Sequence, residues 1–242
     1  MLKQVKQVSL LLTLLFTYQG FAQVAGGNNQ KLFDMFVLGD YEKCADTAIK
    51  MTENDKTNYE SEPYLWVAMC MIKLNEDPEM QEYYPDVNKD ALKFGAKFKK
   101  RDDRLKDKEQ DYIFDENIEF MNELKEIAAQ EAKGYFVQND FRKAVYWYKL
   151  GQKLDPDDAT MQLIKGVTDL YNNNKREGQE EVDAALAKFR EMAKDGSFEI
   201  ADELVIPFED GFIYYAEYLK ENGDRAAAAD IAKLARELDP EN

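Results

Sequence analysis

The chain has 242 residues, a formal net charge of −16 at pH 7, two cysteines and no histidine. The absence of histidine excludes Ser-His-Asp and Cys-His catalysis, and it removes the commonest zinc ligand. The excess of acidic residues is unfavourable for binding nucleic acid or anionic membranes. We therefore expect a protein that is not an enzyme, with no catalytic residues, no metal, no cofactor, no nucleic-acid partner and no small-molecule substrate.

The first 22 residues have the pattern of a secretory signal peptide. Lys3 and Lys6 precede a short apolar run at 8–16, and Ala22 ends a stretch with small residues before Gln23. The alternative is an uncleaved membrane anchor, but the run is short for crossing about 30 Å of hydrocarbon. We expect cleavage after residue 22 and export of the mature chain to the periplasm, without a direct membrane span.

Nearly all of the sequence after residue 28 has the pattern of amphipathic helices. Apolar residues recur at spacings of three and four, and glycine or Asn-Asp pairs separate the segments. No segment alternates with a period of two for long enough to indicate a strand. The sequence therefore predicts an all-α fold.

Two segments near the middle and the end of the chain are similar to each other. Residues 139–156 and 223–240 both begin with a turn pair, continue with small residues at helical spacing, and end in Leu-Asp-Pro. Proline ends a helix because it cannot supply the next N–H. Each segment, with the helix before it, therefore forms a helix hairpin.

These features resemble the tetratricopeptide repeat family, whose helix hairpins of about 34 residues stack into an α-α superhelix, or solenoid. The resemblance implies about five hairpin units, at 28–54, 61–101, 117–156, 158–194 and 207–240. Residues 75–116 and 195–208 depart from the regular repeat. The family places small residues where helices cross closely, and the matching positions here are Cys44, Ala68, Ala132, Ala144, Gly151, Gly166, Ala216, Ala228 and Ala235.

The same resemblance implies a concave groove, lined by the first helix of each unit, that binds other proteins. The alternative is that the irregular segments fold over these residues and bury them as core, and both remain open. The expected groove residues are Phe33, Phe36, Leu65, Met69, Ile72, Lys133, Phe136, Val137, Leu163, Val167, Leu170 and Tyr171.

Cys44 and Cys70 both lie on apolar helical faces. They are expected either to be two small buried side chains or to form one disulfide, since an exported protein meets an oxidising compartment.

The expected function is that of a protein–protein interaction scaffold or adaptor in the bacterial periplasm. It would be a subunit of a secretion, assembly or motility complex of the cell envelope, attached to the outer membrane, if at all, through a partner. The alternative is a periplasmic chaperone or carrier that holds apolar segments of exported proteins, with contacts concentrated on Phe136, Val167, Leu170 and Tyr171.

Overall fold

A computed structural model describes residues 29–240, and this part of the chain consists of α-helices, two short 3-10 helices and connections, without strands. The prediction of an all-α fold is confirmed. The expected signal peptide at 1–22 lies outside the described residues. The helices are α2 (Gln30–Val37), α3 (Tyr41–Glu53), α4 (Glu62–Asn75), α5 (Pro78–Tyr83), α6 (Val87–Lys106), η2 (Asp115–Asn117), α7 (Ile118–Phe136), α8 (Phe141–Gln152), α9 (Ala159–Tyr171), α10 (Lys175–Asp195), η3 (Asp202–Leu204), α11 (Val205–Glu221) and α12 (Arg225–Leu238).

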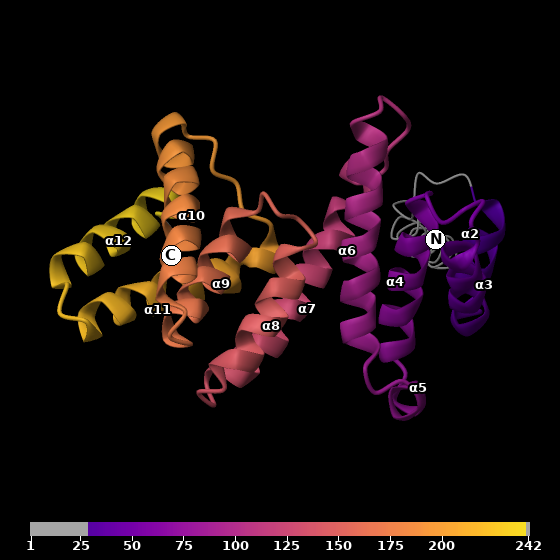
Figure 1. Ribbon diagram of the computed structural model, residues 1–242, viewed down its shortest axis with the longest axis horizontal. Helices are drawn as coiled ribbons and strands as arrows, with labels where there is room; N and C mark the ends of the chain where they lie inside the picture. The colour runs from indigo at the N-terminus through magenta and orange to yellow at the C-terminus, as the bar shows by residue number, and fades with distance from the viewer. Residues whose placement is uncertain (1–28, 241–242) are drawn as a thin grey trace, which may run out of the picture.

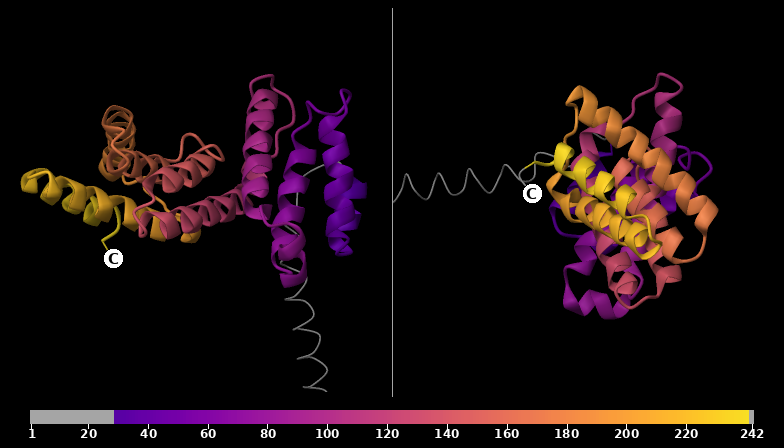
Figure 2. Two further views of the ribbon diagram at one scale, coloured as in Figure 1. Left: turned by 60° about the horizontal axis from the view of Figure 1, so that its bottom comes forward. Right: turned by 90° about the vertical axis from the view of Figure 1, so that its left-hand side faces the viewer.

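The helices follow one another in chain order along the long axis of the molecule (Figure 1). The packed pairs are α2 with α3, α4 with α6, α7 with α8, α9 with α10, and α11 with α12. Two further views show α2 and α3 at one end and α12 at the other (Figure 2). In the C-terminal half, α9 packs on α8, α10 and α11, so it connects three successive pairs.

One turn type joins the two helices of four of these pairs. Gly39, Asn139, Asn173 and Gly223 have φ values of 80°, 60°, 63° and 86°. The next residue in each turn is the N-cap of α3, α8, α10 or α12, and its backbone N–H donates to the carbonyl oxygen five residues earlier. This is the geometry in which a residue with positive φ ends one helix and directs the chain into the next.

The small residues expected at helix crossings lie inside the molecule. Cys44, Ala68, Ala132 and Ala144 have no exposed surface. The other positions, Gly151, Gly166, Ala216 and Ala228, are also buried, while Ala235 is partly buried.

The closest of these crossings is between α9 and α10. A Cβ atom on Gly166 would lie 3.0 Å from the carbonyl oxygen of Gly178, and a Cβ atom on Gly178 would lie 2.7 Å from the carbonyl oxygen of Gly166. The two backbones therefore touch at a point where neither helix has room for a side chain. Gly178 was not recognised from the sequence as the partner of Gly166.

The irregular stretch between α6 and α7 is organised by one buried carboxylate. Asp102 is 1% exposed and accepts hydrogen bonds from Ser61 Oγ at 2.7 Å, Ile113 N at 3.0 Å and Phe114 N at 2.7 Å. Three donors replace the water that the carboxylate loses on burial. The loop thus folds back onto α6, which continues to Lys106, beyond the expected unit boundary at residue 101.

The Leu-Asp-Pro segment after α8 is tied to α7 by a buried lysine. Lys125 has a side chain that is 2% exposed, and its Nζ lies 2.6 Å from Asp158 Oδ2 and 3.6 Å from Asp155 Oδ2. Asp158 also caps α9 by accepting from the Met161 N–H at 2.9 Å. The segment thus fixes the start of α9 against α7.

Gly178→Ala should destabilise the protein by about 1–3 kcal/mol, because the added methyl group has only backbone to displace. Gly134→Ala is the control, since Gly134 lies inside α7 with no atom within 4 Å of the added Cβ. A helix-interior alanine there should be neutral or stabilising by up to about 1 kcal/mol. Urea unfolding of both variants measures the difference, and an equal effect of the two would contradict the close crossing.

Lys125→Met should lower the free energy of unfolding by about 3 kcal/mol, because it leaves two carboxylates without their buried cation. The control is Lys143→Met, whose partner Asp140 lies 3.0 Å away on the surface. That exposed pair should contribute nothing measurable. Unfolding curves of the two variants should therefore separate clearly, and coincidence with the wild type for both would show that Lys125 is not a structural tie.

Candidate functional site

Most of the residues expected to line an open apolar groove lie in the interior, so this expectation is wrong for them. The physical reason is the position of the neighbouring helices: α11 packs across α9, with Leu163 against Gly211, and α3 and α6 enclose α4. These residues are buried in the core, as the alternative interpretation of the sequence expected. Regular helices cover them, however, and not the irregular segments. The buried members, each at most 6% exposed, are Phe36, Leu65, Met69, Ile72, Leu163, Val167 and Leu170.

The remaining expected groove residues keep some access to solvent. Phe33 is half-buried beside Trp66, with ring centroids 6.4 Å apart. Val137 is 65% exposed at the end of α7. Lys133, Phe136 and Tyr171 are partly exposed, and Phe136 and Tyr171 are in ring contact. The structure therefore brings a part of the predicted groove together at the third to fifth helix pairs.

The centre of this region is a group of five partly exposed rings, which we call the aromatic cluster: Phe136, Phe141, Tyr171, Tyr214 and Tyr218. Phe136 stacks on Tyr214 with centroids 4.3 Å apart, and it meets Tyr171 edge-on at 5.3 Å. Tyr171 in turn contacts Phe141 and Tyr218, each at 5.4 Å. Four helices supply these rings, from the end of α7, the start of α8, the end of α9 and the middle of α11.

Three members of the aromatic cluster were missed from the sequence. Phe141 follows the Asn139-Asp140 turn directly, and Tyr214 and Tyr218 are four residues apart on α11. The four-residue spacing places both tyrosines on one helical face. That spacing was the available signal, but nothing in the sequence indicates that this face of α11 meets the ends of α7 and α9.

The tyrosines of the cluster have altered acid–base properties. Burial raises the pKa of Tyr171 to about 12, and the Glu221 and Glu217 carboxylates act in the same direction. Burial, with the nearby Asp210, also raises the pKa of Tyr214 to about 12. The Tyr171 hydroxyl donates to the Tyr214 carbonyl oxygen at 3.3 Å. The hydroxyls are therefore neutral hydrogen-bonding groups at neutral pH.

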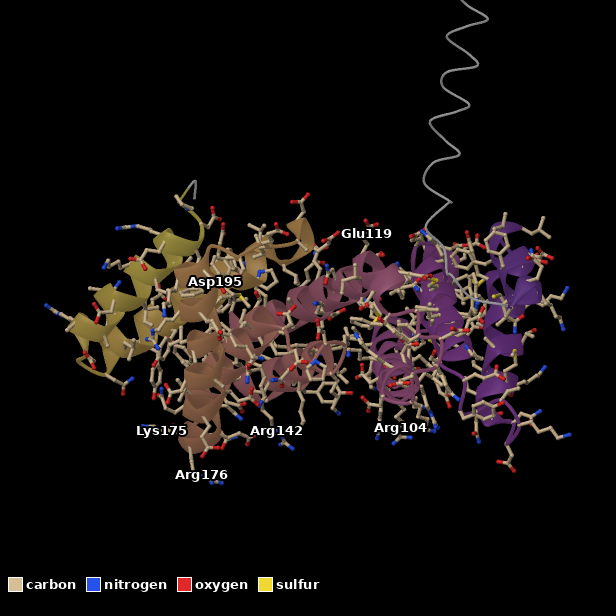
Figure 3. All side chains as sticks on the ribbon, turned by 90° about the horizontal axis from the view of Figure 1, so that it is seen from above. Arg104, Glu119, Arg142, Lys175, Arg176 and Asp195 are labelled. Atoms are coloured by element: carbon tan, nitrogen blue, oxygen red, sulfur yellow. The ribbon has the colours of Figure 1, made fainter. Side chains whose placement is uncertain are left out.

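Ionic side chains of both signs surround the cluster. Lys133 Nζ lies 2.7 Å from Asp210 Oδ2, which joins α7 to α11 next to Phe136. Figure 3 shows Arg142, Lys175 and Arg176 on one side of the molecule, together with Arg104 of α6, and Glu119 on the opposite side. Arg142 follows Phe141, and Lys175 begins the helix after Tyr171. Lys133 with Asp210, and Glu217 with Glu221, thus place charges of both signs at the cluster.

The arrangement can bind by stacking and hydrogen bonding. Tyrosine rings combine a large apolar surface with a polar end, and they lose little side-chain entropy on binding.

Among the residues that the structure describes, no group of three or more Cys, Asp or Glu side chains is placed to hold a metal ion. None of the helices between residues 29 and 240 combines the length and hydrophobicity needed to cross a bilayer.

The raised pKa values of Tyr171 and Tyr214 predict a loss of stability at high pH. An unperturbed tyrosine has a pKa of about 10, and a raised pKa in the folded state means that folding favours the neutral hydroxyl. The resulting contribution to the free energy of unfolding is complete below a pH of about 10. This contribution is lost as the pH rises through about 12. Tyr171→Phe removes one ionising group and should therefore lose less stability between pH 10 and 12 than the wild type.

Urea unfolding across this pH range makes the measurement. Tyr83→Phe on α5, whose ring is 76% exposed, is the control and should decline as the wild type does. Identical declines for wild type and Tyr171→Phe would contradict the expectation.

Comparison of the chain with protein-family models gives no match, and comparison with curated proteins gives none either.

Proposed function

We propose that this chain is a non-enzymatic protein–protein adaptor built from tetratricopeptide-like helix hairpins. Three features of the described residues support the proposal: packed helix pairs in chain order, one recurring turn type, and small residues at the crossings. A stacked array of this kind presents extended surfaces and acts mostly by binding other proteins. We propose that the helix pairs of this chain stack into such a solenoid.

The observation that carries the proposal is the aromatic cluster. Rings from three consecutive helix pairs meet at one surface and remain partly exposed there. Aromatic residues are enriched at protein interfaces and supply most of their hot spots. A partly exposed surface of several rings suits contact with a protein segment.

The proposal includes export to the periplasm and membership of a cell-envelope complex for secretion, assembly or motility. Its support is the signal-peptide pattern at 1–22. Attachment to the outer membrane would then occur through the partner.

A carrier for apolar segments of exported proteins is the second candidate, and the position of its expected contacts weakens it. Val167 and Leu170 are buried under α11, so a passing segment cannot reach them without separating α9 from α11. Phe136 and Tyr171 remain accessible to a partner. The adaptor is therefore the function that the geometry supports better.

The test is recovery of partners from gently solubilised cell envelopes, with the tagged chain as bait and quantitative mass spectrometry as the measurement. Phe136→Ala should reduce recovery of the specific partners at least tenfold, because a hot-spot truncation costs about 2 kcal/mol or more. Tyr83→Ala, which changes a 76% exposed ring on α5, is the control and should recover them at the wild-type level.

Thermal unfolding of each variant establishes that the fold is kept. Recovery of the wild-type chain alone as a monomer would contradict the adaptor, and so would unchanged recovery with folded Phe136→Ala. Broad, weak recovery of many unfolded exported proteins would favour the carrier.

A further inference from the structure

The two cysteines lie together at the junction of the first two helix pairs. Cys44 is on α3 and Cys70 is on α4, they are 26 positions apart in the chain, and neither has exposed surface. The two side chains interact across the packed helices α3 and α4. Cys44 Sγ also lies 3.4 Å from the carbonyl oxygen of Leu32 on α2, so three helices enclose the pair. Both thiols are free in the structure.

We infer that Cys44 and Cys70 are a disulfide-forming pair that joins the first helix pair covalently to the second when the chain folds in the presence of a disulfide donor. The donor is a small-molecule or protein disulfide. The inference goes beyond the adaptor function, and it rests on the proposed export only for the source of that donor.

The reaction is two steps of thiol–disulfide exchange. The thiolate of one cysteine attacks the donor disulfide, which forms a mixed disulfide and releases one donor thiol. The second cysteine then attacks the mixed disulfide, which forms the Cys44–Cys70 bond and releases the second donor thiol. Two protons leave the cysteines, the chain is oxidised by two electrons, and the donor disulfide is reduced to two thiols.

Burial decides when these steps can occur, and either thiol can make the first attack. Because a donor cannot reach sulfur atoms with no exposed surface, the exchange takes place before α2, α3 and α4 have closed on one another.

The position of the pair gives the bond a structural purpose. A helix pair that meets the other described helices mainly through one interface is easily lost by local opening. The first helix pair meets the rest of the molecule mainly through α4. A bond between α3 and α4 crosses that interface. It would keep the two helix pairs together and so prevent unfolding by their separation.

The experiment begins with the full chain, unfolded and reduced, and then refolded in a mixture of oxidised and reduced glutathione. The product is unfolded in the presence of an alkylating agent, because burial protects the thiols of the native protein whether or not they are bonded. Mass spectrometry should show a chain that lacks two hydrogens and carries no alkyl group, with residues 44 and 70 in one linked peptide. A refolded chain with two alkyl groups or with glutathione adducts would overturn the inference.

A stability measurement on the refolded protein gives a second readout. Addition of reductant should lower the thermal midpoint of the oxidised wild type on the order of 5–10 °C, the shift expected for opening a loop of this size. The C44A/C70A double variant should have the same midpoint with and without reductant, which separates loss of the bond from the cost of the substitutions. An equal midpoint for the wild type in both conditions would show that no stabilising bond forms.

These outcomes are independent of those that test the adaptor. The aromatic cluster lies on α7, α8, α9 and α11, away from α3 and α4. The C44A/C70A variant should therefore still recover the partners that Phe136→Ala loses. Failure of disulfide formation would leave the adaptor standing, and failure of partner recovery would leave the disulfide standing.

Discussion

The close approach of α9 and α10 at Gly166 and Gly178 is the constraint on which the C-terminal half of the molecule depends. Two helices can come this near only where both lack side chains, since each added Cβ would meet the carbonyl oxygen of the other helix. With α10 so close on one face, α9 is buried along nearly its whole length. Its other faces are free to receive α8 and α11. The position of α11 over α9 then places Tyr214 beside Phe136 and Tyr171, so the aromatic cluster follows from the crossing.

Buried ion pairs fix the register of the same helices. The Lys165 side chain is 4% exposed and lies 3.0 Å from Asp169 on its own helix and 2.9 Å from Glu181 on α10. Burial alone would lower the pKa of Lys165, but its hydrogen bonds to Glu181 and Asp169 outweigh burial and raise it. Lys125 makes the corresponding connection from α7 to the start of α9. A buried lysine is tolerated only where carboxylates meet it, so a shift of either helix along its axis would leave a charge without a partner.

The parts of this fold that follow from local chemistry were predictable from the sequence. Asn139, Asn173 and the turn glycines mark the helix ends because these residue types accept positive φ. Asp140 and Asp224, which follow two of these turns, cap the next helix with their side chains. The buried state of Leu163, Val167 and Leu170 was not predictable in the same way. It depends on α11, more than thirty residues further along, lying across α9 rather than beside it.

The same distinction explains two structural residues that were missed. Asp102 is one of 48 acidic residues, and it differs from the others only in the donors that surround it, one of which is 41 positions away. Gly178 stands in a strongly polar stretch, where a glycine suggests a weak helix and not a contact. In both cases the sequence contains the residue but not the segment that meets it. Small residues at regular spacing reveal one side of a helix crossing, and the other side is known only when the two helices are placed together.

The aromatic cluster differs from an ordinary exposed apolar patch in that its rings already pack on one another. Phe136 contacts Phe141, Tyr171 and Tyr214, so its position is fixed before any partner arrives. Binding usually costs the conformational entropy of the side chains that become ordered, and rings that are held in place in the free protein avoid most of that cost. Because the supporting helices are held below by the glycine crossing and the buried lysines, a partner can cover the rings without rearranging the core. A surface with these properties supports the proposed adaptor function.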